Sequence, residues 1–311
     1  MENIVVLLPC FNEKSTIEKV INDFKIYLPE AKIYLYDNNS TDGSDTIAKN
    51  AGAIVKYERK QGKGNVIRAM FKDIDARCYV LVDADDTYSL KNVKEMCNKV
   101  LNENYDMVIG DRLSSTYFTE NKRAFHNFGN TLVRDMINRF FDTDIKDIMT
   151  GFRCMSYEFV KTFPVLSRGF EVETEMTIHA VYHNMNILNF PIDYKDRAGE
   201  SQSKLNTVSD GIKVIYKMLS LYKNYKPISF FTFLSAILTL ISTIFFIPIF
   251  IEFIKTGLVL KIPTLVVCVF VYLTALLLFF TGIILSTLAE KDKRDFENIL
   301  KIFTHFRNSN S

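Results

Sequence analysis

A chain of 311 residues is long enough for one domain of about 200 residues plus an appendage, or for two ordinary domains. Its 38 basic and 36 acidic residues leave a net charge of +2. This balance argues against a nucleic-acid-binding protein, which would carry a large basic excess or a basic patch. Five cysteines without a C-x-x-C pair indicate reduced, mostly buried thiols in a cytosolic compartment.

Short apolar runs alternate with helical patterns through the first 110 residues. The run 4–8 has no basic residues before it and meets Pro9 at once, so it predicts a strand rather than a signal peptide. A capping-box pattern at 15–18 opens an amphipathic helix. This alternation predicts a parallel α/β sheet. Further strands are expected at 33–36, 53–57, 79–83 and 105–109, and further helices before Gly52, after Gly64 and over 89–102.

Three carboxylates, Asp83, Asp85 and Asp86, end the strand 79–83. The carboxyl end of a buried strand is where an α/β sheet presents ligands. Aspartates this close repel one another unless a cation lies between them, and oxygen ligands so spaced suit Mg²⁺ or Mn²⁺ carrying a diphosphate. The alternative is a solvated acidic turn, which is the commoner explanation of an isolated D-x-D.

Two other groups of residues are weaker signals of chemistry. Gly62-Lys63-Gly64 at a helix start lets backbone and ammonium groups approach an anion, but it lacks the spacing of a nucleotide-hydrolysing P-loop. His179 and His183 have the spacing of a shared metal site on a helix, without an acid placed as in H-E-x-x-H. Ordinary histidines on a helix surface are the favoured interpretation of this pair.

Two long stretches without charge, 228–251 and 262–289, predict transmembrane helices. The first would span roughly 36 Å as a helix, enough to cross a hydrocarbon core of about 30 Å. A pair of buried core helices is the alternative, although soluble helices rarely run this long without a charge. Basic residues flanking the pair outnumber those at 252–261 between them, so both ends are expected in the cytoplasm.

The segment 207–226 combines an apolar helical stripe with lysines that fall elsewhere on the helix. Such a helix can lie in the headgroup region, with its lysines toward anionic lipid. A packed helix of the globular domain explains the pattern equally well. The stripe comprises Ile212, Ile215, Leu219 and Tyr222, and the lysines are Lys213, Lys217, Lys223 and Lys226.

Four motifs of the first half occur in the order and at the spacing found in family 2 glycosyltransferases of the GT-A fold. They are Val5-Val6-Leu7-Leu8-Pro9-Cys10-Phe11-Asn12-Glu13, Asp37-Asn38-Asn39-Ser40-Thr41-Asp42, Arg59 with Gly62-Lys63-Gly64, and Asp83-Ala84-Asp85. The chain resembles that family, which implies a Rossmann-like, mostly parallel α/β sheet. Asn38, Asn39 and Gln61 depart from the family's usual residues, which leaves Asp37 as the expected nucleobase or ribose contact.

Motifs of the second half resemble the polyprenyl-phosphate glycosyltransferases, the group of dolichyl-phosphate mannose synthase and the bacterial undecaprenyl-phosphate glucosyltransferases. They lie at 110–112, 122–123, 147–153, 169–175 and 197–204. The resemblance implies a catalytic domain over 1–206, a juxtamembrane amphipathic segment over 207–226, two transmembrane helices within 227–290 and a cytoplasmic tail over 291–311. Thr87 stands where mannose synthases have a metal-holding Gln, so Asp86 is the expected substitute.

The resemblance also implies roles for individual residues. Catalytic roles fall to Asp85, Asp147, Arg153 and Glu175. Donor contacts are expected from Pro9, Asn12, Glu13, Asp37, Lys63 and Asp83. The phosphate of the acceptor is expected to meet Arg112, Lys122, Arg123, Arg197, Ser203 and Lys204. A divalent ion, Mg²⁺ or Mn²⁺, is expected on Asp83, Asp85 and Asp86.

The expected reaction is the inverting transfer of one hexose or N-acetylhexosamine from a nucleotide sugar to polyprenyl phosphate, on the cytoplasmic side of the cell membrane. A UDP-linked donor is favoured over GDP-mannose, and a homo-oligomer is compatible with the resemblance. A lipid phosphate has a second pKa of about 6, so it needs cations to hold it rather than a strong base. The chain has no Trp, which excludes the Q-x-x-R-W motif of processive synthases.

Two rival functions remain open at this point. A transferase with a saccharide or diacylglycerol acceptor would need a carboxylate base, for which Glu173 or Glu175 is the candidate. A non-catalytic membrane module that binds or translocates glycolipid is the alternative from another class. Two spans are too few to line a transport path unless the protein oligomerises, and such a module would not need the D-x-D.

Overall fold

The computed structural model describes residues 1–114, 124–169, 171–195, 219–220 and 222–309, and it leaves out the side chains of 124–130, 132, 133 and 308. The chain divides into two compact units. The first comprises Met1–Thr207 together with the residues from Phe296 onward, and the second comprises Val208–Asp295. The amphipathic segment predicted at 207–226 lies mostly outside the described residues.

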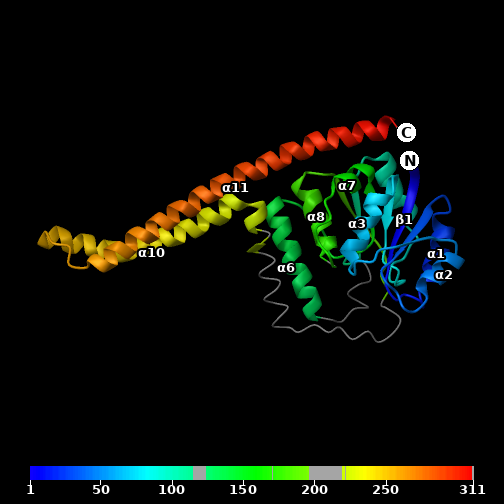
Figure 1. Ribbon diagram of the computed structural model, residues 1–311, viewed down its shortest axis with the longest axis horizontal. Coiled ribbons are helices and arrows are strands. Elements are labelled where there is room, and N and C mark those ends of the chain that lie inside the picture. Colours follow the sequence, from blue (N-terminus) through cyan, green and yellow to red (C-terminus); the bar gives the residue numbers. More distant parts are fainter. Residues whose placement is uncertain (115–123, 170, 196–218, 221, 310–311) are drawn as a thin grey trace. The chain divides into compact units, whose positions relative to one another are not determined.

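A central sheet organises the first unit and contains seven strands within the described residues (Figure 1). The strand order is β3-β2-β1-β4-β6-β5-β7, and β6 alone runs antiparallel to its neighbours. The sheet is therefore mostly parallel, as predicted. The strands are β1 Glu2–Cys10, β2 Lys32–Asp37, β3 Ile54–Tyr57, β4 Ala76–Leu81, β5 Met107–Asp111, β6 Arg153–Ser156 and β7 Ile187–Pro191.

Helices cover both faces of this sheet. On one face, apolar side chains of α1, α2 and α4 join alternate residues of β1 in a common core. On the other face Phe71 of α3 lies edge-on to Tyr79 of β4, with ring centroids 6.4 Å apart, and to Phe163 at 6.3 Å. The helices are α1 Ile17–Tyr27, α2 Ser44–Asn50, α3 Lys63–Asp73, α4 Val93–Asn102, α6 Ala124–Phe141, α7 Tyr157–Thr162 and α8 Val172–Tyr182.

Every residue of α8 except Glu175 is buried, and the end of α11 (Ile262–Ser309) lies against the C-terminal end of α8. His183 stacks on Phe296 of α11, with ring centroids 3.7 Å apart, and His179 contacts the same ring. The prediction that both histidines lie on a helix surface is wrong for His179, which is only 8% exposed. Burial lowers the pKa of His179 to about 3, so its imidazole is neutral at physiological pH.

The C-terminal part of α11 is a docked helix in this structure, which differs from the predicted tail over 291–311. Phe303 packs edge-on against Tyr157 of α7, with ring centroids 6.1 Å apart. Arg307 Nη1 lies 2.8 Å from Oε1 of the buried Glu158. These contacts join residues about 150 positions apart, so no local pattern could predict them.

The second unit is a helical hairpin formed by α10 (Pro227–Thr256) and the apolar part of α11. Both helices are long and apolar enough to cross a membrane, with mean hydropathy of 2.4 and 2.6, and they contain the predicted spans. Ser235 Oγ donates to the carbonyl of Ala275, and Ser242 Oγ donates to that of Cys268. Only 11% of the apolar stretch of α10 and 17% of that of α11 is buried, whereas the core helices of a soluble protein are mostly buried.

Candidate active site

The predicted donor residues of β1 and β2 meet at one edge of the sheet. Cys10 and Asp37 are register partners where the two parallel strands end. Beyond them, the backbone N–H of Asn12 donates to Ser40 Oγ (3.0 Å), and Asn12 Oδ1 accepts from the N–H of Thr41 (2.8 Å). These bonds tie the loops after β1 and β2 into one rim of the candidate site.

Three other residues at this rim were predicted to contact the nucleotide-sugar donor. Pro9 lies within β1, and the N–H of Glu13 donates to Ser44 Oγ (2.9 Å). Asp37 is buried, and its Oδ2 accepts from the N–H of Ser40 (3.0 Å). Its Oδ1 has no hydrogen-bond partner among the described residues. Asp37 therefore keeps acceptor capacity at the edge where a nucleoside is expected.

Asn38, which departs from the family pattern, organises the loop after β3. Its Nδ2 donates to the carbonyls of Glu58 (2.7 Å) and Lys60 (2.9 Å), and its Oδ1 accepts from the N–H of Gly62 (2.7 Å). An ionised Asp could not make the first two bonds, because it has no donor. The asparagine that stands here in place of the family's aspartate therefore positions the glycine-rich turn Gly62-Lys63-Gly64. The sequence analysis did not predict this role.

Lys63 is the first residue of α3, and its ammonium group lies between two carboxylates. Nζ contacts Asp83 Oδ1 and lies 2.5 Å from Glu173 Oε1. Burial by itself would lower the pKa of Lys63, but the two carboxylates raise this pKa above its usual value, so the group stays charged. Burial raises the pKa of Glu173, and Lys63 opposes that effect. Lys63 was expected to contact the donor, whereas Glu173 was named only as the base of a rival reaction.

The two glycines beside Lys63 let the turn approach the chain that precedes α8. Gly62 has a φ of +128°, in the left-handed region that favours glycine. A Cβ on Gly64 would overlap the carbonyl of Ser167, and the N–H of Gly64 donates to the carbonyl of Arg168 (3.1 Å). The position of Lys63 therefore depends on this close backbone contact.

Glu175, predicted to be catalytic, supports the same contact from α8. Its Oε1 accepts from the N–H of Leu166 (3.2 Å), and its Oε2 accepts from the N–H of Ser167 (2.9 Å). Both carboxylate oxygens therefore hold the segment against which the glycine-rich turn packs.

The three aspartates after β4, which together form an acidic run, lie in different surroundings. Asp83 contacts Lys63, and its side chain is 28% exposed. Asp85 Oδ1 accepts from Thr87 Oγ1 (2.7 Å), so Thr87 orients the second carboxylate. Asp86 has a φ of +57°, and its Oδ1 lies 2.6 Å from Lys19 Nζ on α1. Among the described residues, no three or more His, Cys, Asp or Glu side chains form a group that could hold a metal.

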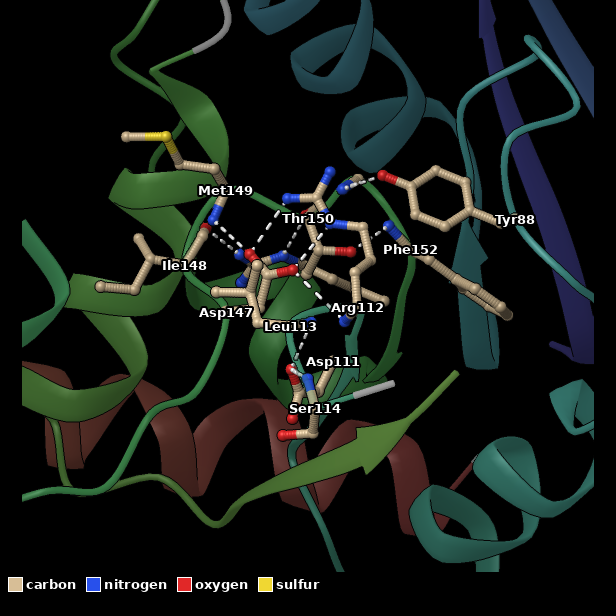
Figure 2. Close-up of polar contacts among 12 residues, drawn as sticks. Tyr88, Asp111, Arg112, Leu113, Ser114, Asp147, Ile148, Met149, Thr150 and Phe152 are labelled. Atoms are coloured by element: carbon tan, nitrogen blue, oxygen red, sulfur yellow. Dashed lines mark hydrogen bonds and ion pairs between the residues drawn. The ribbon is translucent and has the colours of Figure 1, made fainter. Parts of the chain in front are cut away.

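The loop between α6 and β6 is held at both ends by polar contacts (Figure 2). The buried Asp147 accepts two bonds from Arg112, Nε to Oδ2 (2.7 Å) and Nη2 to Oδ1 (3.0 Å). Near the other end, the N–H of Gly151 donates to the hydroxyl of Tyr88 (2.9 Å). A Cβ on Gly151 would overlap the carboxylate of Asp83. The loop backbone is therefore in direct contact with the acidic run.

Arg153, also predicted to be catalytic, is fully buried beneath this loop. Its Nη2 donates to the carbonyl of Ile148 (2.7 Å), its Nε to that of Thr150 (3.2 Å), and its Nη1 to Thr177 Oγ1 (2.9 Å). Burial lowers the pKa of Arg153 to about 10, which leaves it charged at neutral pH. Its observed contacts are those of a group that supports the loop.

Arg112 is the one predicted acceptor residue within the described part of the chain. It is paired with Asp147, and its guanidinium carbon lies 5.4 Å from the ring centroid of Tyr194. The acceptor roles of the whole set stay predictions. The other five residues, Lys122, Arg123, Arg197, Ser203 and Lys204, lie outside the described residues.

Three similarities to known proteins bear on this site. Protein RfbJ of Shigella flexneri is 51% identical over 110 residues, which are 35% of this chain and 85% of the relative. A dolichyl-phosphate hexose transferase of Haloferax volcanii is 27% identical over 214 residues, 68% of this chain and 91% of the relative. Glucosyl-3-phosphoglycerate synthase of Mycobacterium tuberculosis, solved with Mn²⁺, UDP and phosphoglyceric acid, shares the fold, with a TM-score of 0.57 and 18% identity over 71% of this chain and 78% of that one.

The sequence profile described as "Glycosyl transferase family 2" matches residues 5–163. This match covers about half of the chain and includes all four motifs of the first half, the last of which lies in the acidic run. The expected fold class is also confirmed, because a mostly parallel α/β sheet is followed by two long apolar helices. The chain is thus a glycosyltransferase that belongs to glycosyl transferase family 2.

Proposed function

We propose that this glycosyltransferase moves a single hexose or N-acetylhexosamine from a UDP-linked sugar to a polyprenyl phosphate, with inversion at the anomeric carbon. One observation carries the proposal. The part of the chain that matches family 2 forms the sheet edge where a nucleotide sugar is expected, and two helices of membrane-spanning length follow it in the same chain. The similarity to a protein named dolichyl-phosphate hexose transferase supports a lipid phosphate acceptor. The fold neighbour solved with UDP supports the nucleotide.

The donor would lie along the edge formed by the ends of β1, β2 and β4. One oxygen of Asp37 has no hydrogen-bond partner among the described residues and could accept from a nucleobase or ribose group. Pro9, Asn12 and Glu13 lie in and after the neighbouring strand. Lys63 lies beside Asp83 and would offset the charge of the diphosphate. The edge therefore offers acceptors for the nucleoside and a cation for the phosphates.

The acidic run fits Mg²⁺ or Mn²⁺. Asp83 and Asp85 are hard oxygen donors, and such ions are held in nucleotide sites by one or two carboxylates together with substrate phosphates. A third protein ligand is therefore not required, and the pairing of Asp86 with Lys19 makes Asp86 the least suited of the three. When bound, the ion would neutralise charge that develops on the departing diphosphate.

The surroundings of the two candidate bases favour a phosphate acceptor over a hydroxyl acceptor. Glu173 is ion-paired with Lys63, and both oxygens of Glu175 accept backbone N–H groups. A hydroxyl nucleophile would need one of these carboxylates to take its proton. A phosphate dianion carries its own charge and needs only to be held in line. Arg153, buried beneath the loop, and Arg112, paired with Asp147, would position that loop.

The hairpin would hold the catalytic unit at the cytoplasmic face of the membrane. Basic residues are more numerous before α10 and after the apolar part of α11 than at 252–261 between the two apolar stretches. This charge distribution is the support for placing both termini in the cytoplasm, where nucleotide sugars are expected.

The test is transfer by the purified full chain with Mn²⁺, a panel of UDP-sugars and GDP-mannose, and undecaprenyl phosphate as acceptor. We expect one sugar per lipid phosphate from a UDP-linked donor, detected by mass spectrometry of the lipid. The matched control acceptor is undecaprenol, which has the same chain without the phosphate. Transfer to undecaprenol or to a saccharide, without transfer to the lipid phosphate, would contradict the proposal and favour the rival reaction.

A further inference from the structure

The ammonium group of Lys63 is shared by two carboxylates that differ in access to solvent. The side chain of Asp83 is 28% exposed, whereas that of Glu173 is 5% exposed. Glu173 belongs to the first turn of α8, whereas Asp83 follows β4. An ion that arrives from solvent can therefore reach Asp83 while Glu173 stays covered.

This difference matters because Asp83 has two possible cationic partners. A carboxylate that binds a divalent ion no longer offsets a neighbouring ammonium group to the same extent, and the two cations repel each other. A lysine held only by Asp83 would then be displaced from the site. Glu173 supplies a second negative charge, 2.5 Å from Lys63 Nζ, that such an ion does not reach.

Stability alone is a weak reason for this arrangement. A buried ion pair is often no more stabilising than apolar side chains of the same volume. In addition, Glu173 Oε2 has no hydrogen-bond partner among the described residues, which makes the burial of this carboxylate costly. The acidic first turn of α8 could favour Glu173 through the helix dipole, but Glu171 at the N-cap could serve that purpose from an exposed position.

We propose that Glu173 is a positioning residue that keeps the Lys63 ammonium beside the acidic run while Asp83 binds the donor's metal ion. The proposal rests on the donor site described under the proposed function. It gives Glu173 a role that acts through Lys63, in place of the role of base considered in the rival reaction. The glycine-rich turn and the bonds of Glu175 fix the backbone of this lysine, and Glu173 fixes its charged end.

The test measures the affinity for UDP of the full chain in detergent with excess Mn²⁺, by calorimetry, together with the midpoint of thermal unfolding. We compare Glu173→Gln, Lys63→Met and the double variant. Glu173→Gln is expected to weaken UDP binding by about tenfold, the scale of one charge-assisted contact. Because Glu173 acts through Lys63, the double variant should bind UDP as Lys63→Met does, within about twofold.

Two further variants separate positioning from a general structural effect. Glu171→Gln removes a charge from the same end of α8 and should leave UDP affinity unchanged, even where it lowers the unfolding midpoint through the helix dipole. Glu173→Asp keeps the buried charge on a shorter side chain, so its affinity should lie between those of the wild type and Glu173→Gln. If Glu173→Gln does not fold, Glu173→Asp is compared with the wild type and Lys63→Met, and wild-type affinity in Glu173→Asp would overturn the role of Glu173.

The outcomes that contradict the proposal are distinct from one another. Wild-type affinity in Glu173→Gln, or losses that multiply in the double variant, would overturn the role of Glu173 while leaving the donor site intact. A Glu173→Asp variant that binds no better than Glu173→Gln would do the same. A wild-type protein that binds no UDP with Mn²⁺ would overturn the donor site and this proposal together.

Discussion

The substitution Gly151→Ala tests whether the loop between α6 and β6 sets the position of the acidic run. An added Cβ would lie 2.8 Å from Asp83 Cγ and 3.1 Å from Oδ1, whereas ordinary contact begins at 3.4 Å. The loop cannot easily retreat, because Arg112, Arg153 and Tyr88 all bond to it. The carboxylate of Asp83 must therefore move.

The size of this movement gives the expected effect. Removing the overlap with Oδ2, the nearest atom of Asp83, requires a shift of about 1 Å, which exceeds the tolerance of catalytic groups. A displacement approaching 1 Å costs about 10²-fold in rate, or about 2.7 kcal/mol of activation free energy. We therefore expect Gly151→Ala to lower kcat/KM for the nucleotide sugar by about 10²-fold. The Mn²⁺ concentration that gives half-maximal activity should rise as well, because Asp83 is an expected ligand.

The control is Gly52→Ala, at the end of α2. Its φ of +87° makes alanine strained, but the added Cβ would meet only the flexible end of Lys25. We expect Gly52→Ala to lower the unfolding midpoint without changing the Mn²⁺ dependence. Wild-type kcat/KM and Mn²⁺ dependence in Gly151→Ala would refute the reasoning that this loop positions Asp83.

Four further predictions concern other parts of the molecule. Asp85→Asn should lower turnover by at least about 10²-fold, and full activity in excess EDTA would contradict a role for a divalent ion. Glu175→Gln should keep more than about a hundredth of the wild-type rate, because its carboxylate holds backbone amides; a fall of about 10⁴-fold would identify it as a base. The depressed pKa of His179 means that the folded protein binds fewer protons than the unfolded chain, so stability should be full above about pH 6.5 and fall as the pH drops toward 3. Melting curves at pH 7.5 and 5 should show this loss, and His179→Phe should reduce it. In intact cells, an impermeant thiol reagent should label Lys255→Cys but not Lys293→Cys, and the reverse would invert the proposed orientation.

The sequence by itself determined the features that depend on neighbouring residues. Apolar runs ending in turn formers located most of the strands, within a few residues of their observed bounds, because a buried strand needs a continuous apolar segment. The acidic run after β4 and the glycine-rich turn at the start of α3 were also visible as local patterns. The two long apolar helices were predicted from composition alone, since few other structures accommodate so many residues without a charge.

Only the tertiary structure decided how distant residues pair. β6 lies antiparallel between β4 and β5, and the short run at 153–156 carries no signal of its direction. Lys63 and Glu173 are 110 positions apart, so their ion pair depends on the packing of α3 and α8 against the same sheet. The resemblance implied a catalytic role for Arg153, and only the structure places its guanidinium beneath the loop, where it donates to loop carbonyls. Such pairings follow from long-range packing, in which many arrangements share the same local pattern and only the buried contacts of the folded chain select one.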